Sequence, residues 1–402
     1  MNTHRKQKKQ LTAAILAALL AMPAYGHAFV KAPEYVYYNG KPIVEIQELT
    51  KGEELGRFVN KAEYTLDPSL IEPVKSGTAY WTGLLGAKVK NGQPWQVFVT
   101  TQEGVQNAYA KTFSHTKEKG DFRDTNVNFV VQQLQDGKSL LRMQEDADKL
   151  PPGDYGYSIV LIGQYVGAAR QGTVDGWWVD TDTVLPTNEQ AADFVGTFRH
   201  ELGHALGIYN LVDYLDEQGN VYVPKNRSEV KCSKATGEEM TRFSSQVTDV
   251  RSWNLHLVDQ NLNPAKPGME ILSAAGFAEK KKADPGVKES DFFIVNNRFK
   301  KEDASGKNGK AFFIGPNVTD ALAGATFFGV NGVPVNGWEH GAFEGSHLQT
   351  AGMMSHRAYS NYTSFMEVEL ALMQDLGYTI DREAYFGHSV YGDGTTFTNT
   401  QG

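Results

Sequence analysis

Cysteine is almost absent from this chain: Cys232 is the single one among 402 residues. One thiol excludes an internal disulfide framework and any zinc site built on several thiolates. Basic residues are also in the minority, with 39 Lys plus Arg against 47 Asp plus Glu and a formal net charge of −8. Because an acidic surface repels phosphate backbones, we expect no nucleic-acid partner. Hydrophobic residues (41%) and aromatic residues (11%) are not scarce, which predicts a folded globular protein.

Long apolar runs are missing beyond the N-terminus. There, four cations within Arg5–Lys9 precede the eleven-residue apolar run Leu11–Ala21, and small residues follow at Ala24, Gly26 and Ala28. This order is typical of a secretory signal peptide cleaved after Gly26 or Ala28, whereas the run is short for a membrane anchor. We therefore expect an exported protein, secreted or at the cell surface, with no membrane span in its mature chain. The mature part would carry 35 Lys plus Arg against 47 acidic residues, a net charge of −12.

The pattern along the mature chain predicts a mixed α+β fold, in which helices pack on a twisted sheet. Apolar residues at helical spacing predict helices over 77–86, 126–134 and 365–376, the last ending at Gly377. Alternating or continuous apolar runs predict strands over 95–100, 157–162, 176–179, 253–258 and 311–314.

A further helix carries the most informative motif. A capping box at Thr187–Gln190 predicts its start, apolar residues recur every three or four positions up to Leu206, and Gly207 predicts its end. The helix contains the sequence HELGH at His200–His204. Histidines four apart share one helix face, so both imidazoles can bind one zinc ion. Glu201 is then offset toward a water on an open zinc position and can act as general base. The alternative interpretation is a surface helix that carries two histidines by chance, and we prefer the zinc site.

The residues by themselves leave the third zinc ligand open. The extended form of the motif places it at Asn210, three residues after the glycine, but neutral amides bind zinc poorly. We therefore interpret Asn210 as a residue at the helix exit. Asp213 is the nearest carboxylate.

The segment His200–Gly207 (HELGHALG) resembles the zinc-binding helix of the metzincin metallopeptidases, in particular the leishmanolysin group, in which a long insertion precedes the third histidine. Gly345-Ser346-His347, then Gly352–Ser355 (GMMS), then 365–378 resemble the third histidine, the methionine turn and the closing helix of that group. The resemblance covers these short blocks and their order. Similar blocks occur in bacterial secreted metallopeptidases that form the passenger of autotransporters, and the tail 386–402 resembles the start of a β-solenoid stalk.

The resemblance implies a role for each matching residue. The zinc ligands are His200, His204 and His347, the general base is Glu201, Gly207 forms the exit turn, Met353 or Met354 packs beneath the imidazoles, and His340 and His356 are alternatives to His347. It also implies a metzincin-like two-subdomain fold. We expect a signal peptide (1–28), an N-terminal catalytic subdomain with the zinc helix (29–207), a loop-rich C-terminal subdomain with the insertion and the methionine turn (208–385), and a tail (386–402).

Other candidate sites have weaker support. Cys232 lacks the surrounding motif of an inhibitory cysteine, so we expect a half-buried free thiol. Asp175, Asp180 and Asp182 lack calcium-loop spacing and are interpreted as solvated strand ends. The sequons at Asn226, Asn317 and Asn361 matter only in a glycosylating cell.

The hypothesis from the sequence is an exported zinc endopeptidase acting on protein or peptide substrates. An extended substrate would lie between the two subdomains, with the strand near Trp177–Val179 as a template for pairing. The alternatives are a surface adhesin or binding module with a structural zinc site, and a non-proteolytic zinc hydrolase. An outer-membrane translocator is a further expected partner if the chain belongs to an autotransporter.

Overall fold

The computed structural model describes most of the chain between residues 29 and 381. The described ranges are 29–55, 61–86, 94–104, 107–115, 122–124, 130–136, 140–141, 143, 153–164, 173–179, 192–215, 218, 220–222, 244–248, 252–295, 310–339, 342–350, 352–355 and 365–381. The predicted signal peptide and the predicted tail lie outside these ranges. The structure is α+β, with several sheets and few helices, as the sequence predicts.

The largest element of the fold is a six-stranded mixed sheet in the order β1-β2-β3-β6-β4-β5. Its strands are β1 (Glu34–Tyr38), β2 (Lys41–Glu48), β3 (Trp95–Glu103), β4 (Ala108–His115), β5 (Phe122–Asp124) and β6 (Tyr155–Gln164). The neighbours β2, β3 and β6 run parallel, whereas β1, β4 and β5 pair antiparallel with their neighbours. The strands predicted at 95–100 and 157–162 are confirmed as β3 and β6, each longer than predicted.

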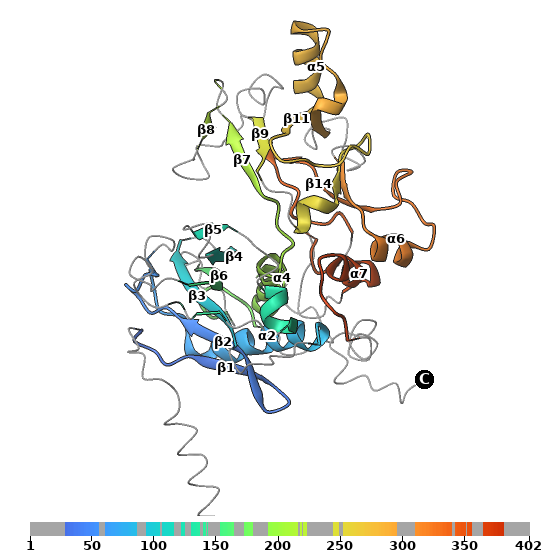
Figure 1. Ribbon diagram of the computed structural model, residues 1–402. Coiled ribbons are helices and arrows are strands. Elements are labelled where there is room, and N and C mark those ends of the chain that lie inside the picture. The colour runs from blue at the N-terminus through green and yellow to red at the C-terminus, as the bar shows by residue number, and fades with distance from the viewer. Residues whose placement is uncertain are drawn as a thin grey trace, which may run out of the picture.

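The two central strands are buried on both faces, which explains why each has apolar side chains on both faces. Val97 and Val160 point to one face and join the core beneath the helices. Phe98 and Tyr157 point to the other face, where they form a second cluster and their rings meet edge to face with centroids 5.6 Å apart. Figure 1 shows helices α2 (Ile71–Leu84) and α4 (Phe194–Ala205) together on one side of this sheet.

The helix predicted at 77–86 is α2, which begins six residues earlier at Ile71 and ends before Gly86. It packs against α4, and the Trp81 indole nitrogen donates a hydrogen bond to the Arg199 carbonyl (2.7 Å). The helix predicted at 126–134 lies partly outside the described residues. What is described there includes a π-helical turn over Gln132–Asp136.

The later part of the chain forms smaller sheets and short helices. Its strands are β7 (Val212–Leu215), β8 (Val221–Tyr222), β9 (Ser244–Val247), β10 (Leu257–Val258), β11 (Glu270–Ser273), β12 (Phe292–Val295), β13 (Lys310–Phe313), β14 (Val333–Asn336), β15 (Trp338–Glu339) and β16 (Ala342–Phe343). They form sheets in the orders β12-β11-β9-β7-β8, β10-β13-β14 and β15-β16. The helices are α5 (Ala274–Ala283), α6 (Pro316–Leu322) and α7 (Glu367–Asp375). The strand predicted at 311–314 is β13, and the predicted closing helix is α7.

The segment that follows α7 packs back against the N-terminal part of the chain. The Tyr378 hydroxyl donates to the Leu206 carbonyl at the end of α4 (2.8 Å). The Thr379 amide donates to the Gln135 side chain (2.7 Å), and the Asp381 amide donates to the Leu84 carbonyl at the end of α2 (2.7 Å). These bonds hold the segment after α7 against the ends of α2 and α4. Burial raises the pKa of Tyr378 well above its ordinary value.

Three local predictions were wrong. The helix with the histidines begins at Phe194 rather than after Thr187, which lies outside the described residues; the Asp193 carboxylate caps it by accepting from the Gly196 amide (3.1 Å). The strand predicted at 253–258 is a 3-10 helix over Ser252–His256 followed by the two-residue strand β10.

The third wrong prediction concerns Trp177–Val179, where the structure has a turn and isolated bridges instead of a strand. Asp175 (φ 51°) and Gly176 (φ 83°) turn the chain, so Trp177 bonds back to Val174. The Trp178 amide and carbonyl bond to the Ala192 carbonyl and the Phe194 amide. The amides and carbonyls of Trp177 and Trp178 are thus engaged within the chain and do not pair with a substrate strand in this conformation.

No helix in the described ranges combines the length and the apolar character needed to cross a bilayer. The boundaries expected for the two subdomains stay predictions. Figure 1 shows the six-stranded sheet apart from the smaller sheets.

Candidate metal centre

Helix α4 places two histidines one turn apart in the interior of the protein. Its apolar residues Phe194, Phe198 and Leu202 pack in the main core. His200 (1% exposed) and His204 (7% exposed) are also buried, because later parts of the chain cover their side of the helix. A surface helix with two chance histidines is therefore the wrong interpretation.

The structure brings a third histidine to this pair from 143 residues further along the chain. The Nε2 atoms of His200 and His204 are 3.2 Å apart, and His347 Nε2 lies 3.1 Å from the first and 3.2 Å from the second. The rings of His200 and His347 are nearly parallel (13°), and the His204 ring is nearly perpendicular to both. We call these three residues the histidine site.

The second ring nitrogen of each histidine faces a hydrogen-bond acceptor. His200 Nδ1 lies 2.8 Å from the Met353 carbonyl, His204 Nδ1 lies 2.7 Å from the Ile208 carbonyl, and His347 Nδ1 faces the Glu344 carboxylate. Because these acceptors require Nδ1 to carry the proton, each neutral ring presents an Nε2 lone pair to the centre. Three lone pairs converging at this distance repel one another unless a cation lies among them.

The spacing of the three nitrogens fits zinc. A tetrahedral zinc ion with Zn–N bonds of about 2.0–2.1 Å separates two ligand nitrogens by about 3.3 Å. The measured separations of 3.1–3.2 Å are close to that value. Neutral imidazoles held by carbonyl or carboxylate groups at Nδ1 are also the usual form of histidine ligands in zinc sites. The donor set therefore suits a divalent transition metal.

Gly207 determines how His204 is held. The residue has φ 122°, a region that only glycine adopts without strain, and it ends α4 as the sequence predicts. The Ile208 amide then bonds back to the Gly203 carbonyl (3.1 Å), and the Ile208 carbonyl reaches His204 Nδ1. The turn thus supplies the partner that orients the second histidine.

Asn210 has a structural role that the sequence did not reveal. Its amide donates to the Ser346 hydroxyl (3.0 Å), and its side-chain nitrogen donates to the Glu344 carbonyl (3.4 Å). Asn210 is not part of the histidine site. It lies where the extended motif would have a ligand, and it fixes the loop that brings His347 instead.

The loop with His347 is held from other directions as well. The Trp253 indole donates to the Gly345 carbonyl (2.8 Å), and the Asn336 amide donates to the His347 carbonyl (2.8 Å). The Leu348 amide donates to the Met354 carbonyl (2.9 Å), which joins the loop to the predicted methionine turn. The position of His347 is therefore fixed by strand β14, the 3-10 helix before β10 and the methionine turn together.

The predicted methionine turn, Gly352–Ser355, lies directly against α4. Met353 and Met354 are fully buried. The Met353 main-chain carbonyl orients His200, and the Met354 thioether packs against Gly203, in the middle of α4. Met353 and Met354 thus act differently, one through its main chain and the other through its side chain.

Gly203 has no room for a side chain. A Cβ at this position would lie 2.2 Å from Met354 Sδ and 3.1 Å from the Trp81 ring. We expect Gly203→Ala to lower the free energy of unfolding by about 1–3 kcal/mol, as overpacked cores do. Denaturant titration measures this change in the free energy of unfolding. Gly83→Ala is the matched control, because its Cβ meets nothing within 4 Å in helix α2; a Gly203→Ala protein as stable as that control would contradict the packing.

Glu201 lies on α4 directly after His200 and is 5% exposed. Glu201 is therefore a buried carboxylate in the residue next to His200.

The sequence analysis did not identify two carboxylates that lie near the histidine site. Glu344 lies three residues before His347, so its spacing from a candidate ligand was an available signal. Glu369 gave no signal, because its contact with Met353 and Met354 arises from packing of α7. Burial raises the pKa of Glu369 to about 7, against the lowering effect of three main-chain amides that donate to it.

The structure does not test several candidates of the sequence analysis. His340, His356, Cys232, Asp180, Asp182, Asn226 and Asn361 lie outside the described residues. Asp175 accepts a hydrogen bond from the Gln164 side chain (2.7 Å). The side-chain nitrogen of Asn317, which a glycan would occupy, donates to Asp375 (2.7 Å) and is thereby engaged.

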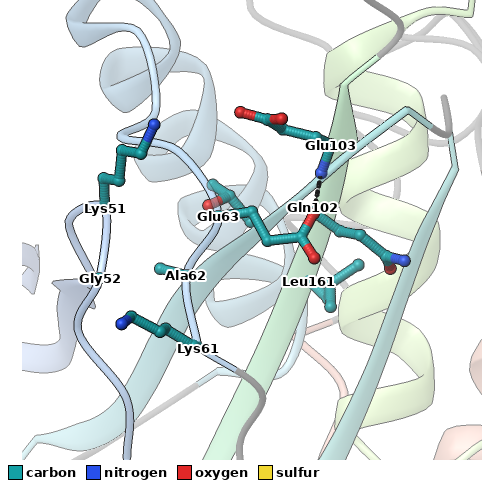
Figure 2. Close-up of a pocket in the computed structure, with 9 residues that line it drawn as sticks. Lys51, Gly52, Lys61, Ala62, Glu63, Gln102, Glu103 and Leu161 are labelled. Atoms are coloured by element: carbon teal, nitrogen blue, oxygen red, sulfur yellow. Dashed lines mark hydrogen bonds between the residues drawn. The ribbon is translucent and has the colours of Figure 1, made fainter.

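A separate surface pocket of about 630 Å³ lies elsewhere on the six-stranded sheet (Figure 2). Leu161 lines it from β6 and points away from the face of Val160 and Ile162, which pack beneath the helices. Lysines and carboxylates both line this pocket, and the Glu103 amide donates to Glu63 across it. It contains none of the predicted site residues.

Comparison with known proteins adds no family to this description, since no protein-family model, no curated protein and no solved structure matches the chain.

Proposed function

We propose that this protein is an exported zinc endopeptidase of the metzincin type, with Glu201 as its general base. The observation that carries the proposal is the convergence of the Nε2 atoms of His200, His204 and His347, each with Nδ1 facing an acceptor. The HELGH sequence, the late third histidine and the buried methionine turn support the metzincin comparison. The signal-peptide pattern of residues 1–28 supports export.

The number of protein ligands favours catalysis over a structural role. Structural zinc sites are closed by four protein ligands, whereas catalytic sites have three and keep one position for water or substrate. Among the described residues, the group that could hold an ion has three members, all histidines. A binding module with a structural site would also gain nothing from a buried Glu201 beside His200.

Zinc at this site would bring the pKa of a water close to neutrality and polarise the carbonyl of a peptide bond. The residues of the chain supply the rest. The Glu201 carboxylate accepts the proton of the attacking water and passes it to the leaving amine. The acceptors at the three Nδ1 atoms keep the imidazoles neutral and oriented. Burial of α4 limits bulk water near these groups.

The test is the zinc content and the peptidase activity of the mature protein. We expect one zinc per chain and cleavage of unfolded casein that a chelator abolishes and added zinc restores. Bound zinc without cleavage of casein or of a peptide library would support the binding-module alternative. Cleavage that survives complete removal of metal would refute the proposal.

A further inference from the structure

The Glu369 carboxyl group is buried at the contact between α7 and the methionine turn. It is 1% exposed, and it lies at the third position of α7. Oε1 accepts a hydrogen bond from the Met354 amide (2.8 Å). Oε2 accepts from the Met366 amide (2.8 Å), as a capping residue does, and also from the Met353 amide (3.3 Å).

The methionine turn is shaped around this carboxyl group. The Ser355 amide bonds to the Gly352 carbonyl (3.2 Å) and closes a four-residue turn. A Cβ on Gly352 would lie 2.2 Å from Glu369 Oε2, so the turn approaches the carboxyl group more closely than any side chain would permit. The two amides at the centre of the turn, those of Met353 and Met354, both point to Glu369.

The opposite side of the same turn contacts the histidine site. The Met353 carbonyl faces His200 Nδ1 (2.8 Å), the Met354 carbonyl accepts from Leu348 next to His347 (2.9 Å), and the Met354 thioether packs at Gly203. A shift of the turn would therefore move the Met353 carbonyl, which faces His200, and Leu348, which is next to His347.

We propose that Glu369 is a positioning residue for the metal centre, acting through the methionine turn on His200 and His347. The proposal rests on the proposed function, because it requires that the histidine site bind zinc. Glu369 does not touch the metal or the substrate. Its carboxylate fixes the two amides of the turn, and the turn fixes the orientation of the imidazoles.

The main test is the zinc affinity of Glu369→Gln, measured in the full mature chain by competition with a chromophoric chelator. Glutamine has one oxygen and one NH₂ group, so at least one of the three amides would face a donor instead of an acceptor. We expect a loss of zinc affinity of about 10–100-fold, as for other residues that orient zinc ligands. The visible spectrum of the Co²⁺-substituted protein should change as well, because the imidazoles are reoriented.

The matched control is Asp259→Asn. Asp259 is likewise fully buried and accepts from the main-chain amides of Asn261, Asn263 and Ile294, but it joins the loop after β10 to β12. Removing its charge should lower stability and leave zinc affinity and the Co²⁺ spectrum as in the wild type. A general loss of stability would affect both variants alike.

Glu369→Asp keeps the test decisive if the glutamine variant does not fold. The shorter side chain retains the charge but cannot reach all three amides, so zinc affinity should lie between those of wild type and Glu369→Gln. Wild-type zinc affinity and an unchanged Co²⁺ spectrum in a folded Glu369 variant would overturn the proposal. If the wild-type protein itself binds no zinc, the proposed function fails instead.

Discussion

Glu201→Gln is expected to abolish most of the peptidase activity and to leave the zinc in place. The amide is nearly the size of the carboxylate but cannot accept the proton of the attacking water. General acid–base catalysis by one side chain contributes about 10²–10⁴-fold, so kcat should fall by about that factor. Glu201 does not belong to the group of residues that could hold the ion, so the zinc content should stay at that of the wild type.

The measurement is a steady-state assay of casein or peptide cleavage together with metal analysis of the same sample. Glu367→Gln is a suitable control, because it makes the same change at an exposed carboxylate of α7. Its kcat should match that of the wild type. Full activity in Glu201→Gln would assign the general base to another residue.

His347→Ala is expected to weaken zinc binding by about 10²–10⁴-fold. Structural zinc sites have apparent binding free energies of about 10–16 kcal/mol, and losing one of three similar ligands removes about a third of that. The remaining pair, His200 and His204, lies on α4 and can still bind zinc weakly. Glu344→Gln should show a smaller loss of about 10–100-fold, because it only weakens the partner at His347 Nδ1.

Chelator competition measures both variants, with His256→Ala as the control. His256 stacks on Phe313, and its Nδ1 faces the Ile314 carbonyl (2.9 Å), outside the histidine site. Its loss should leave zinc affinity unchanged. His340→Ala and His356→Ala should do the same. If either of them releases zinc while His347→Ala retains it, the third ligand has been misassigned.

The sequence predicted the helix of the histidines well at one end and poorly at the other. Its end at Gly207 was predictable because glycine is nearly alone in adopting φ 122° without strain. Its start was wrong because Thr187–Gln190 fits a capping box, and such boxes also occur by chance. The actual cap, Asp193, is fixed in place by the bridge between Trp178 and Asp193, a contact that no local pattern shows.

The strands show the same division. Strands β3 and β6 were predictable, β3 from its alternating pattern and β6 from its apolar run. Trp177–Val179 has an equally apolar sequence but forms a turn, because the Trp177 indole is buried against β6 and donates to the Gly163 carbonyl (2.6 Å). A tertiary contact decided that segment against its local preference.

By itself, the sequence determined the mixed α+β class, the helix that carries His200 and His204, and the preference for imidazole over thiolate ligands in a chain with one cysteine. Each of these follows from composition or from spacings of a few residues, which local geometry converts directly into structure. The tertiary structure decided that His347 meets the helix pair, that Asn210 anchors the loop of His347, that Glu344 faces His347 Nδ1, and that Glu369 accepts from the amides of the methionine turn. These contacts join segments separated by up to 147 residues, and only packing of the whole chain brings their atoms within hydrogen-bond distance.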